Sequence, residues 1–167
     1  AETDTVFHLA AKARVQPSIS DPISFDNTNV HSLVKLLKGC VDNNVKNFVF
    51  SSSSSVYGDN PILPKIENRV GNVLSPYAAT KKIDEIYANV FWRCYGIETI
   101  GMRYFNVFGE RQDPNGAYAA VIPKFISLMK QNKSPTVNGD GSYSRDFTFI
   151  DNVVKANYLA LNTNNSK

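Results

Sequence analysis

A tyrosine and a lysine four residues apart, Tyr77 and Lys81, are a pair whose types and spacing could do chemistry. A free phenol titrates near ~10 and is a poor base at neutral pH. On a helix, this spacing places both side chains on one face, where the ammonium favours the phenolate and lowers the tyrosine pKa. The pair is therefore a candidate general base, and later acid, for a hydroxyl proton near neutral pH.

The same spacing also arises by chance on amphipathic helices, where the ring only packs and the ammonium is solvated. The chemical interpretation therefore needs a helix that begins at this point. Ser75 is a good N-cap, and Pro76 suits the first helical position, where no backbone N–H is needed. Gly96 suits the left-handed position after a helix end. We expect one helix over residues 76–95.

A run of serines over residues 51–55 forms a second candidate site. Such a run is usually a flexible linker. Here it directly follows residues 45–50, an apolar run typical of a buried parallel strand, and it precedes Tyr57 and Gly58. Ligands of open α/β sheets bind at the carboxyl ends of strands. The serines are therefore expected to line a site.

Composition narrows the function classes. The 167 residues, 43% hydrophobic and 20% charged, are enough for a sizeable core, and the net charge of +3 without a basic run does not indicate nucleic acid. No apolar run is long enough for a membrane span, and no signal peptide is seen, so we expect a cytoplasmic protein. The isolated Cys40 and Cys94 predict reduced thiols, and His8 is expected in the core, so no metal site is predicted.

Strand-like and helix-like segments alternate along the chain, which indicates an α/β fold with a mainly parallel sheet. We expect strands at residues 5–9, 45–50, 97–104, 136–137 and 145–150, and helices at 21–43, 76–95, 119–131 and 151–161. In the first of these helices, an apolar side is expected to comprise Val30, Leu33, Val34, Leu36 and Leu37. The last fifty residues are spaced more loosely and resemble part of a smaller lobe.

Five stretches taken together, HLAA, SSSSSVYG, SPYAATK, MRYFNVFG and SRDF, resemble the extended short-chain dehydrogenase/reductases. Within that family the chain is similar to the NAD-dependent nucleotide-sugar epimerases and dehydratases. Residues 103–147 most resemble the bacterial UDP-N-acetylglucosamine 4-epimerases of polysaccharide biosynthesis. The resemblance covers nearly the whole chain. It implies a Rossmann-like, doubly wound parallel sheet, NAD as the cofactor and a UDP-sugar as the substrate.

The chain departs from the family in one respect. Members of the family carry a glycine-rich turn, G-x-x-G-x-x-G, that holds the cofactor pyrophosphate at a helix N-terminus. This motif does not occur in the present sequence. We therefore expect an internal fragment of a protein about twice this length. Residues 1–116 would be the C-terminal part of the NAD-binding domain, and residues 117–167 part of the nucleotide-sugar lobe. NAD binding by the isolated chain is then an open question.

The resemblance also implies roles for single residues. Tyr77 would take the proton of the sugar 4-hydroxyl during transient oxidation by NAD, Lys81 would hold the nicotinamide ribose, and Ser53 would bridge the sugar oxygen and the phenolate. The further cofactor positions implied are Leu9, Ala10, Ala11, Thr28, Ser51 and Phe105. The substrate positions implied, besides Ser53, are Ser54, Ser55, Asn106, Ala120, Val121, Lys124, Thr136, Asn138 and Arg145.

Several of these residues have a purely structural explanation as well. Asn106 can cap a turn, Lys124 can be solvated, and Arg145 can pair with Asp140 or Asp146. A guanidinium nevertheless suits a diphosphate, because it forms paired, charge-assisted hydrogen bonds. Both explanations stay open at this point.

Two serines disfavour the dehydration and decarboxylation reactions of related enzymes. The related dTDP-glucose dehydratases carry an Asp-Glu pair where this chain has Ser54 and Ser55, and the UDP-glucuronate decarboxylases carry a glutamate at the second position. A serine cannot supply that acid and base at neutral pH. The sequence therefore favours inversion at carbon 4 over dehydration or decarboxylation.

The leading expectation from the resemblance is the interconversion of UDP-N-acetylglucosamine and UDP-N-acetylgalactosamine. The sugar could instead be glucose or a uronic acid, because substituent pockets cannot be read from one sequence. The chain could also be an inactive nucleotide-sugar-binding fragment. A homodimer through helices 21–43 and 76–95 is implied by the family, although their apolar stripes could equally belong to the core.

Overall fold

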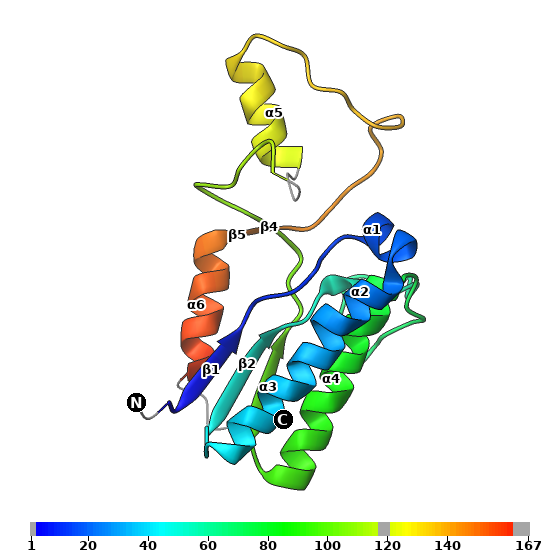
Figure 1. The fold of residues 1–167 in the computed structure, drawn as a ribbon. Coiled ribbons are helices and arrows are strands. Elements are labelled where there is room, and N and C mark those ends of the chain that lie inside the picture. Colours follow the sequence, from blue (N-terminus) through cyan, green and yellow to red (C-terminus); the bar gives the residue numbers. More distant parts are fainter. Residues whose placement is uncertain (1–2, 117–120, 162–167) are drawn as a thin grey trace. The chain divides into compact units, whose positions relative to one another are not determined.

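The computed structural model describes residues 3–116 and 121–161, and its elements are labelled in Figure 1. Contacts divide the chain into two units. One unit runs to Tyr104 and takes in the chain again from Asn157, and the other comprises Phe105–Ala156. The assignment of residues 1–116 to a cofactor domain and of 117–167 to a substrate lobe stays a prediction.

The first unit is built on a three-stranded parallel sheet, ordered β1 (Thr5–His8), β2 (Asn47–Ser51) and β3 (Glu98–Met102). In the register, Val49 lies between Phe7 and Ile100. Because all three strands run the same way, their carboxyl ends share one edge of the sheet. The predicted α/β fold with a parallel sheet is confirmed.

Two helices, α3 (Ser32–Asp42) and α4 (Pro76–Tyr95), cover one face of this sheet (Figure 1). Alternate residues of β2 point to one face, so Phe48 and Phe50 both reach the helices. They form a buried cluster with Leu33 and Leu37 of α3 and Phe91 of α4, among others. Each fully buried side chain of this size stabilises the fold by roughly 1.5–3 kcal/mol, so this cluster anchors α4 to the sheet.

The limits predicted for α4 are confirmed. The Ser75 hydroxyl accepts a hydrogen bond from the backbone N–H of Ala78 at 3.1 Å, and Pro76 is the first helical residue. At the other end, Gly96 has a φ of 72° and its N–H donates to the Trp92 carbonyl. A left-handed φ favours glycine, which explains the stop.

We expect Ser75→Ala to lower the free energy of unfolding by about 1 kcal/mol, because the Ala78 N–H then loses its side-chain acceptor. Urea denaturation of the whole protein that contains this chain measures the change. The exposed Ser134, changed to alanine, is the matched control and should have little effect. Equal losses in the two variants would contradict the capping role.

The helix expected over residues 21–43 is interrupted in the structure. Its first part, α2 (Pro22–Asp26), leads into a π-helical turn, η1 (Asn27–His31), before α3. The widened turn accompanies the buried Asn29, whose amide bonds with two distant segments. Leu36 was wrongly placed on the apolar side, because it is 40% exposed. A further short helix, α1 (Val15–Ser20), was not predicted.

The second unit contains a two-stranded parallel sheet and a helix, and α6 begins in it. These elements are β4 (Asn106–Phe108), β5 (Phe147–Phe149), α5 (Val121–Lys130) and α6 (Ile150–Leu161). Strand β4 was not predicted. The Phe108 ring contacts the rings of Phe147 and Phe149, with centroids 6.3 and 5.5 Å away.

Two local predictions in this unit are wrong. Residues 136–137 do not form a strand; they are followed by a turn in which Gly139 and Gly141 have positive φ. Asp151 does not precede its helix but lies in the first turn of α6, where a carboxylate still favours the N-terminal dipole. The start expected for the α5 helix, at residue 119, lies outside the described residues. Within residues 3–116 and 121–161, no helix is long and apolar enough to cross a membrane.

Candidate active site

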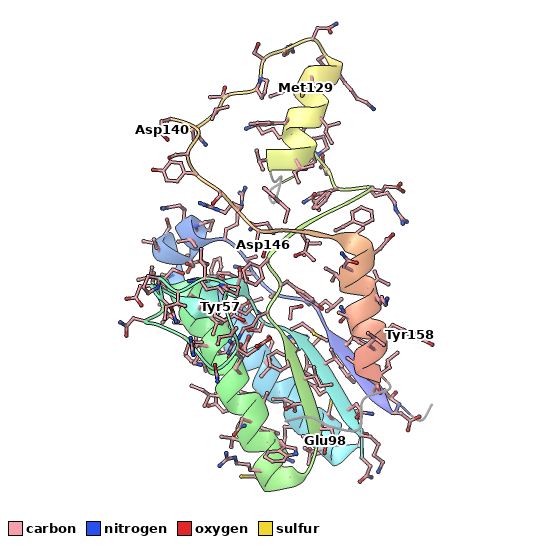
Figure 2. The ribbon with its side chains drawn as sticks, turned by 180° about the vertical axis from the view of Figure 1, so that it is seen from behind. Tyr57, Glu98, Met129, Asp140, Asp146 and Tyr158 are labelled. Carbon is pink, nitrogen blue, oxygen red and sulfur yellow. The ribbon has the colours of Figure 1, made fainter. Side chains whose placement is uncertain are left out.

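The serine run is an ordered extension of the sheet. Strand β2 ends at Ser51, the N–H of Ser52 donates to the Met102 carbonyl, and the N–H of Ser54 donates to the Tyr104 carbonyl, both at 2.9 Å. A 3₁₀ turn, η2 (Ser54–Tyr57), follows. Figure 2 shows Tyr57 near the carboxyl edge of the sheet and Glu98, the first residue of β3, at the other end. The serines therefore lie where the sheet predicts a site.

Ser53 caps the η2 turn and is buried. Its Oγ accepts hydrogen bonds from the backbone N–H of Ser55 at 3.2 Å and from the Ser55 hydroxyl at 2.9 Å. A hydroxyl has two acceptor sites and one proton to donate. Both acceptor sites of Ser53 have partners here, so its own proton is the part suited to an incoming oxygen.

Tyr77 is held at the start of α4 by two other helices. Its backbone N–H donates to Ser18 Oγ of α1 at 3.1 Å, and the Ser18 hydroxyl donates to the Val15 carbonyl at 2.6 Å. The half-buried tyrosine ring meets the edge of Phe25 of α2, with centroids 6.4 Å apart at 80°. The roles of Ser18 and Phe25 were missed, since they lie more than fifty residues before Tyr77 and no spacing pattern connects them to it.

A second tie runs through Thr80. Its hydroxyl donates to the Tyr77 carbonyl at 2.8 Å and accepts from the Asn29 amide at 2.9 Å. Asn29 also bonds both backbone groups of Lys12, at 2.8 and 3.0 Å. The segment after β1, with the predicted cofactor positions Leu9, Ala10 and Ala11, is thus tethered to the helix of the candidate base. Thr28, another predicted cofactor position, lies half-buried on η1.

Lys81 is buried, with only 3% of its surface exposed. Its Nζ donates to the Ser51 carbonyl at 2.9 Å and to Asp84 Oδ2 at 3.2 Å. His8, at the end of β1, is buried against the Phe48 ring, as expected for a core histidine. Burial and the charge of Lys81 lower the pKa of His8, which keeps it neutral near pH 7.

Glu85 and Arg103 form a partly buried ion pair beside the serines. The guanidinium donates through Nε and Nη2 to the two carboxylate oxygens at 2.8 and 2.9 Å, and the Ser52 hydroxyl donates to the same carboxylate at 2.6 Å. The guanidinium also lies over the Tyr57 ring, 4.9 Å from its centroid. Burial opposes ionisation of Glu85, but the hydrogen bonds from Arg103 and Ser52 prevail and lower its pKa. The sequence analysis missed this pair, although Arg103 lies within the MRYFNVFG stretch.

The lowered pKa of Glu85 predicts acid sensitivity. The pair stabilises the fold fully above the ordinary glutamate value of 4.5, and this contribution is lost as the pH falls through the lower folded-state pKa. We expect the thermal midpoint of the whole protein to drop more between about pH 6 and about pH 3 than that of Glu85→Gln. Parallel curves for the two proteins would rule out this contribution.

The predicted substrate residues of the second unit have partners of their own. The Asn106 amide donates to the Asp146 carbonyl at 2.9 Å, so its structural role is present and UDP contact stays a prediction. The exposed Arg145 donates to the Ser144 carbonyl at 2.7 Å. Asp140 instead accepts from Ser142, and within the described ranges no ion pair joins Arg145 to Asp140 or Asp146.

The remaining substrate and cofactor positions lie in the second unit. Val121 and Lys124 are exposed on α5, Thr136 and Asn138 are exposed in the following segment, and Phe105 is half-buried. Ala120 lies outside the described residues. Their roles remain predictions.

The donor set around Lys81 fits the ribose of a dinucleotide. An ammonium carries three N–H donors, and Ser51 and Asp84 take two of them among the residues the structure describes. The third suits a hydroxyl acceptor. Leu9 and Ala10, which directly follow β1, are exposed. The Lys81 ammonium and the exposed residues after β1 would thus be available to NAD at the carboxyl end of the sheet.

Comparisons with known proteins identify similar sequences and structures. The UDP-N-acetylglucosamine 4-epimerase of Methanobrevibacter ruminantium, solved with UDP-N-acetylmuramic acid, is 46% identical, with a TM-score of 0.93 over 98% of this chain and 53% of that one. The UDP-glucose 4-epimerase of Thermus thermophilus, solved with NAD, is 32% identical, with a TM-score of 0.86 over 96% of this chain and 54% of that one.

A relative identified by its sequence is also an epimerase. The UDP-glucose 4-epimerase of Mycolicibacterium smegmatis is 39% identical over 155 residues, which are 92% of this chain and 49% of the relative. The chain thus spans about half the length of the proteins it matches. The predicted Rossmann-like fold and NAD as cofactor are confirmed. Since the match to the family extends over residues 1–167, the chain belongs to the NAD-dependent epimerase/dehydratase family.

Proposed function

We propose that the whole protein containing this chain is a UDP-sugar 4-epimerase that interconverts UDP-N-acetylglucosamine and UDP-N-acetylgalactosamine. One observation carries the proposal. The lysine four residues after Tyr77 donates to the carbonyl of Ser51, two residues before Ser53, which supports a common site for the three candidate groups at this edge of the sheet. The 46% identity to a UDP-N-acetylglucosamine 4-epimerase supports this choice of sugar.

In this proposal Tyr77 accepts the proton of the sugar 4-hydroxyl and later returns it to the same oxygen. NAD, when bound, supplies reversible oxidation at carbon 4. Ser53 donates its hydroxyl proton to the sugar oxygen and holds it beside the phenol. Lys81 provides the positive charge that favours the phenolate, and its remaining N–H is available to a ribose hydroxyl. Ser54 and Ser55 carry no carboxyl group for dehydration.

Epimerisation of UDP-glucose is the second candidate, and the Mycolicibacterium and Thermus relatives favour it. The deciding experiment incubates the whole protein separately with UDP-N-acetylglucosamine, UDP-glucose and UDP-glucuronate and compares kcat/KM. The N-acetylated sugar should be converted most efficiently. A higher kcat/KM for UDP-glucose would replace the first choice, and no conversion of any sugar with NAD bound would remove the epimerase proposal.

Two further assignments belong to this proposal. The exposed Leu36 of α3 and the exposed Ile86, Tyr87 and Val90 of α4 suit a homodimer, and the mass of the whole protein in solution tests it. The product would enter surface-polysaccharide synthesis, as residues 103–147 imply. We also propose that the whole protein works in the cytoplasm, where the isolated Cys40 and Cys94 would stay reduced.

A further inference from the structure

A buried carboxylate, Asp84, lies on the same helix as the candidate base. It follows Tyr77 by seven residues and Lys81 by three, and at 3.6 residues per turn all three share one face of α4. Asp84 is 0% exposed, and its Oδ2 accepts from Lys81 Nζ at 3.2 Å. The charge of the lysine therefore acts on its surroundings together with the charge of Asp84.

The titratable groups around Asp84 come from three elements. Lys81 and Glu85 are on α4, and Asp26 is on α2. His8 is the last residue of β1, and the charge of Lys81 lowers its pKa. Glu85 is bonded to Arg103, and His8 is kept neutral. Burial raises the pKa of Asp84, with Glu85 and Asp26 adding to the rise, and the Lys81 ammonium opposes it. The ammonium is thus the charged group that favours the ionised form of this carboxylate.

The second oxygen of Asp84 is a further observation. Oδ1 is buried and has no hydrogen-bond partner among the described residues. Buried polar atoms are nearly always bonded, and a half-satisfied carboxylate beside an ammonium weakens the fold compared with an apolar pair. A residue that only stabilised α4 would not need a carboxylate here.

Epimerisation makes a specific demand on the base. One group must remove the proton of the 4-hydroxyl and then return it, which works best when its pKa lies near the working pH. An ammonium that acted alone, next to an oxidised nicotinamide, would favour the phenolate so strongly that proton return would slow. A negative charge near the ammonium reduces this preference for the phenolate.

Resting on the proposed function, we propose that Asp84 is a positioning residue that holds the Lys81 ammonium against the Ser51 carbonyl and weakens its positive field at Tyr77. Asp84 thereby sets the pH range in which the phenol both accepts and returns a proton. The residue acts through Lys81.

The test is Asp84→Asn in the whole protein, which keeps the shape and removes the charge. We expect the acid limb of the kcat profile to move to lower pH by about one unit, with little change in KM. Asp84→Glu should restore the charge and move the limb back. The matched control is Asp42→Asn, which removes a carboxylate that is 55% exposed and paired with Lys38 on α3, and it should leave the limb in place.

An unshifted acid limb in an active Asp84→Asn enzyme overturns the proposal. A second measurement separates it from the proposed function: the phenolate of Tyr77 is titrated by ultraviolet absorbance, as the difference from Tyr77→Phe, with and without Asp84→Asn. A downward shift supports the inference even if no sugar is converted, and no shift overturns it. If neither Asp84 variant folds by circular dichroism, Asp84 is a stability residue and the proposal fails.

Discussion

Tyr77→Phe is expected to lower kcat of the whole protein by about 10²–10⁴-fold, because the loss of the phenol removes the group that carries the substrate proton. The fold should persist. The bond from the Tyr77 backbone to Ser18 and the ring contact with Phe25 do not involve the phenolic oxygen, and Ser75 still caps the helix. The measurement is the steady-state rate with UDP-N-acetylglucosamine, beside the NAD content of the purified protein.

The control for this prediction is Tyr95→Phe, which makes the same chemical change at an exposed position at the end of the same helix and keeps the ring that contacts Phe91. It should retain the activity of the unmodified protein. If Tyr77→Phe keeps bound NAD and works within tenfold of that rate, Tyr77 is not the base. If it loses NAD, its role is in binding and the catalytic assignment fails as well.

Arg103→Leu is expected to lower the free energy of unfolding by about 2 kcal/mol, because the largely buried Glu85 carboxylate then keeps only the Ser52 hydroxyl and the Lys82 ammonium, 3.8 Å away, as partners. The guanidinium also leaves the Tyr57 ring and the carbonyl of Glu67, to which its Nη1 donates at 2.9 Å. Chemical denaturation of the whole protein measures the loss.

The double variant Arg103→Leu, Glu85→Leu is the informative comparison. Replacement of both charges by apolar groups removes the buried carboxylate that has lost its guanidinium partner, so the double variant should be more stable than Arg103→Leu alone. A double variant that is less stable than the single one would show that Glu85 stabilises the fold without its partner. In that case the pair is not the unit we describe.

Local signals along the chain predicted the helix of the candidate base well. Ser75, Pro76 and Gly96 act on their immediate neighbours, so the limits of α4 could be read directly. The serine run was placed correctly for a similar reason, because an apolar strand directly precedes it. Residues 136–137 show the reverse case, in which two residues with a strand-like pattern find no partner strand in the described structure.

Contacts that join distant segments could not be predicted. Ser18 meets the Tyr77 backbone across 59 residues and Asn29 meets Thr80 across 51, and no spacing rule connects them. The turn η1, which the Asn29 bonds accompany, was therefore read as a regular helix. The Glu85–Arg103 pair joins a helix to the residue after a strand, and it could not be predicted for the same reason.

The five consecutive serines illustrate how identical side chains become unequal once a chain folds. The Ser51 carbonyl accepts a hydrogen bond from the Lys81 ammonium, and the Ser52 hydroxyl donates to the Glu85 carboxylate. The Ser53 hydroxyl accepts from the hydroxyl of Ser55. Since neighbouring side chains of an extended segment point to opposite sides, deletion of one serine before the η2 turn would exchange these roles among the remaining serines. Length, more than composition, is what this tract must conserve.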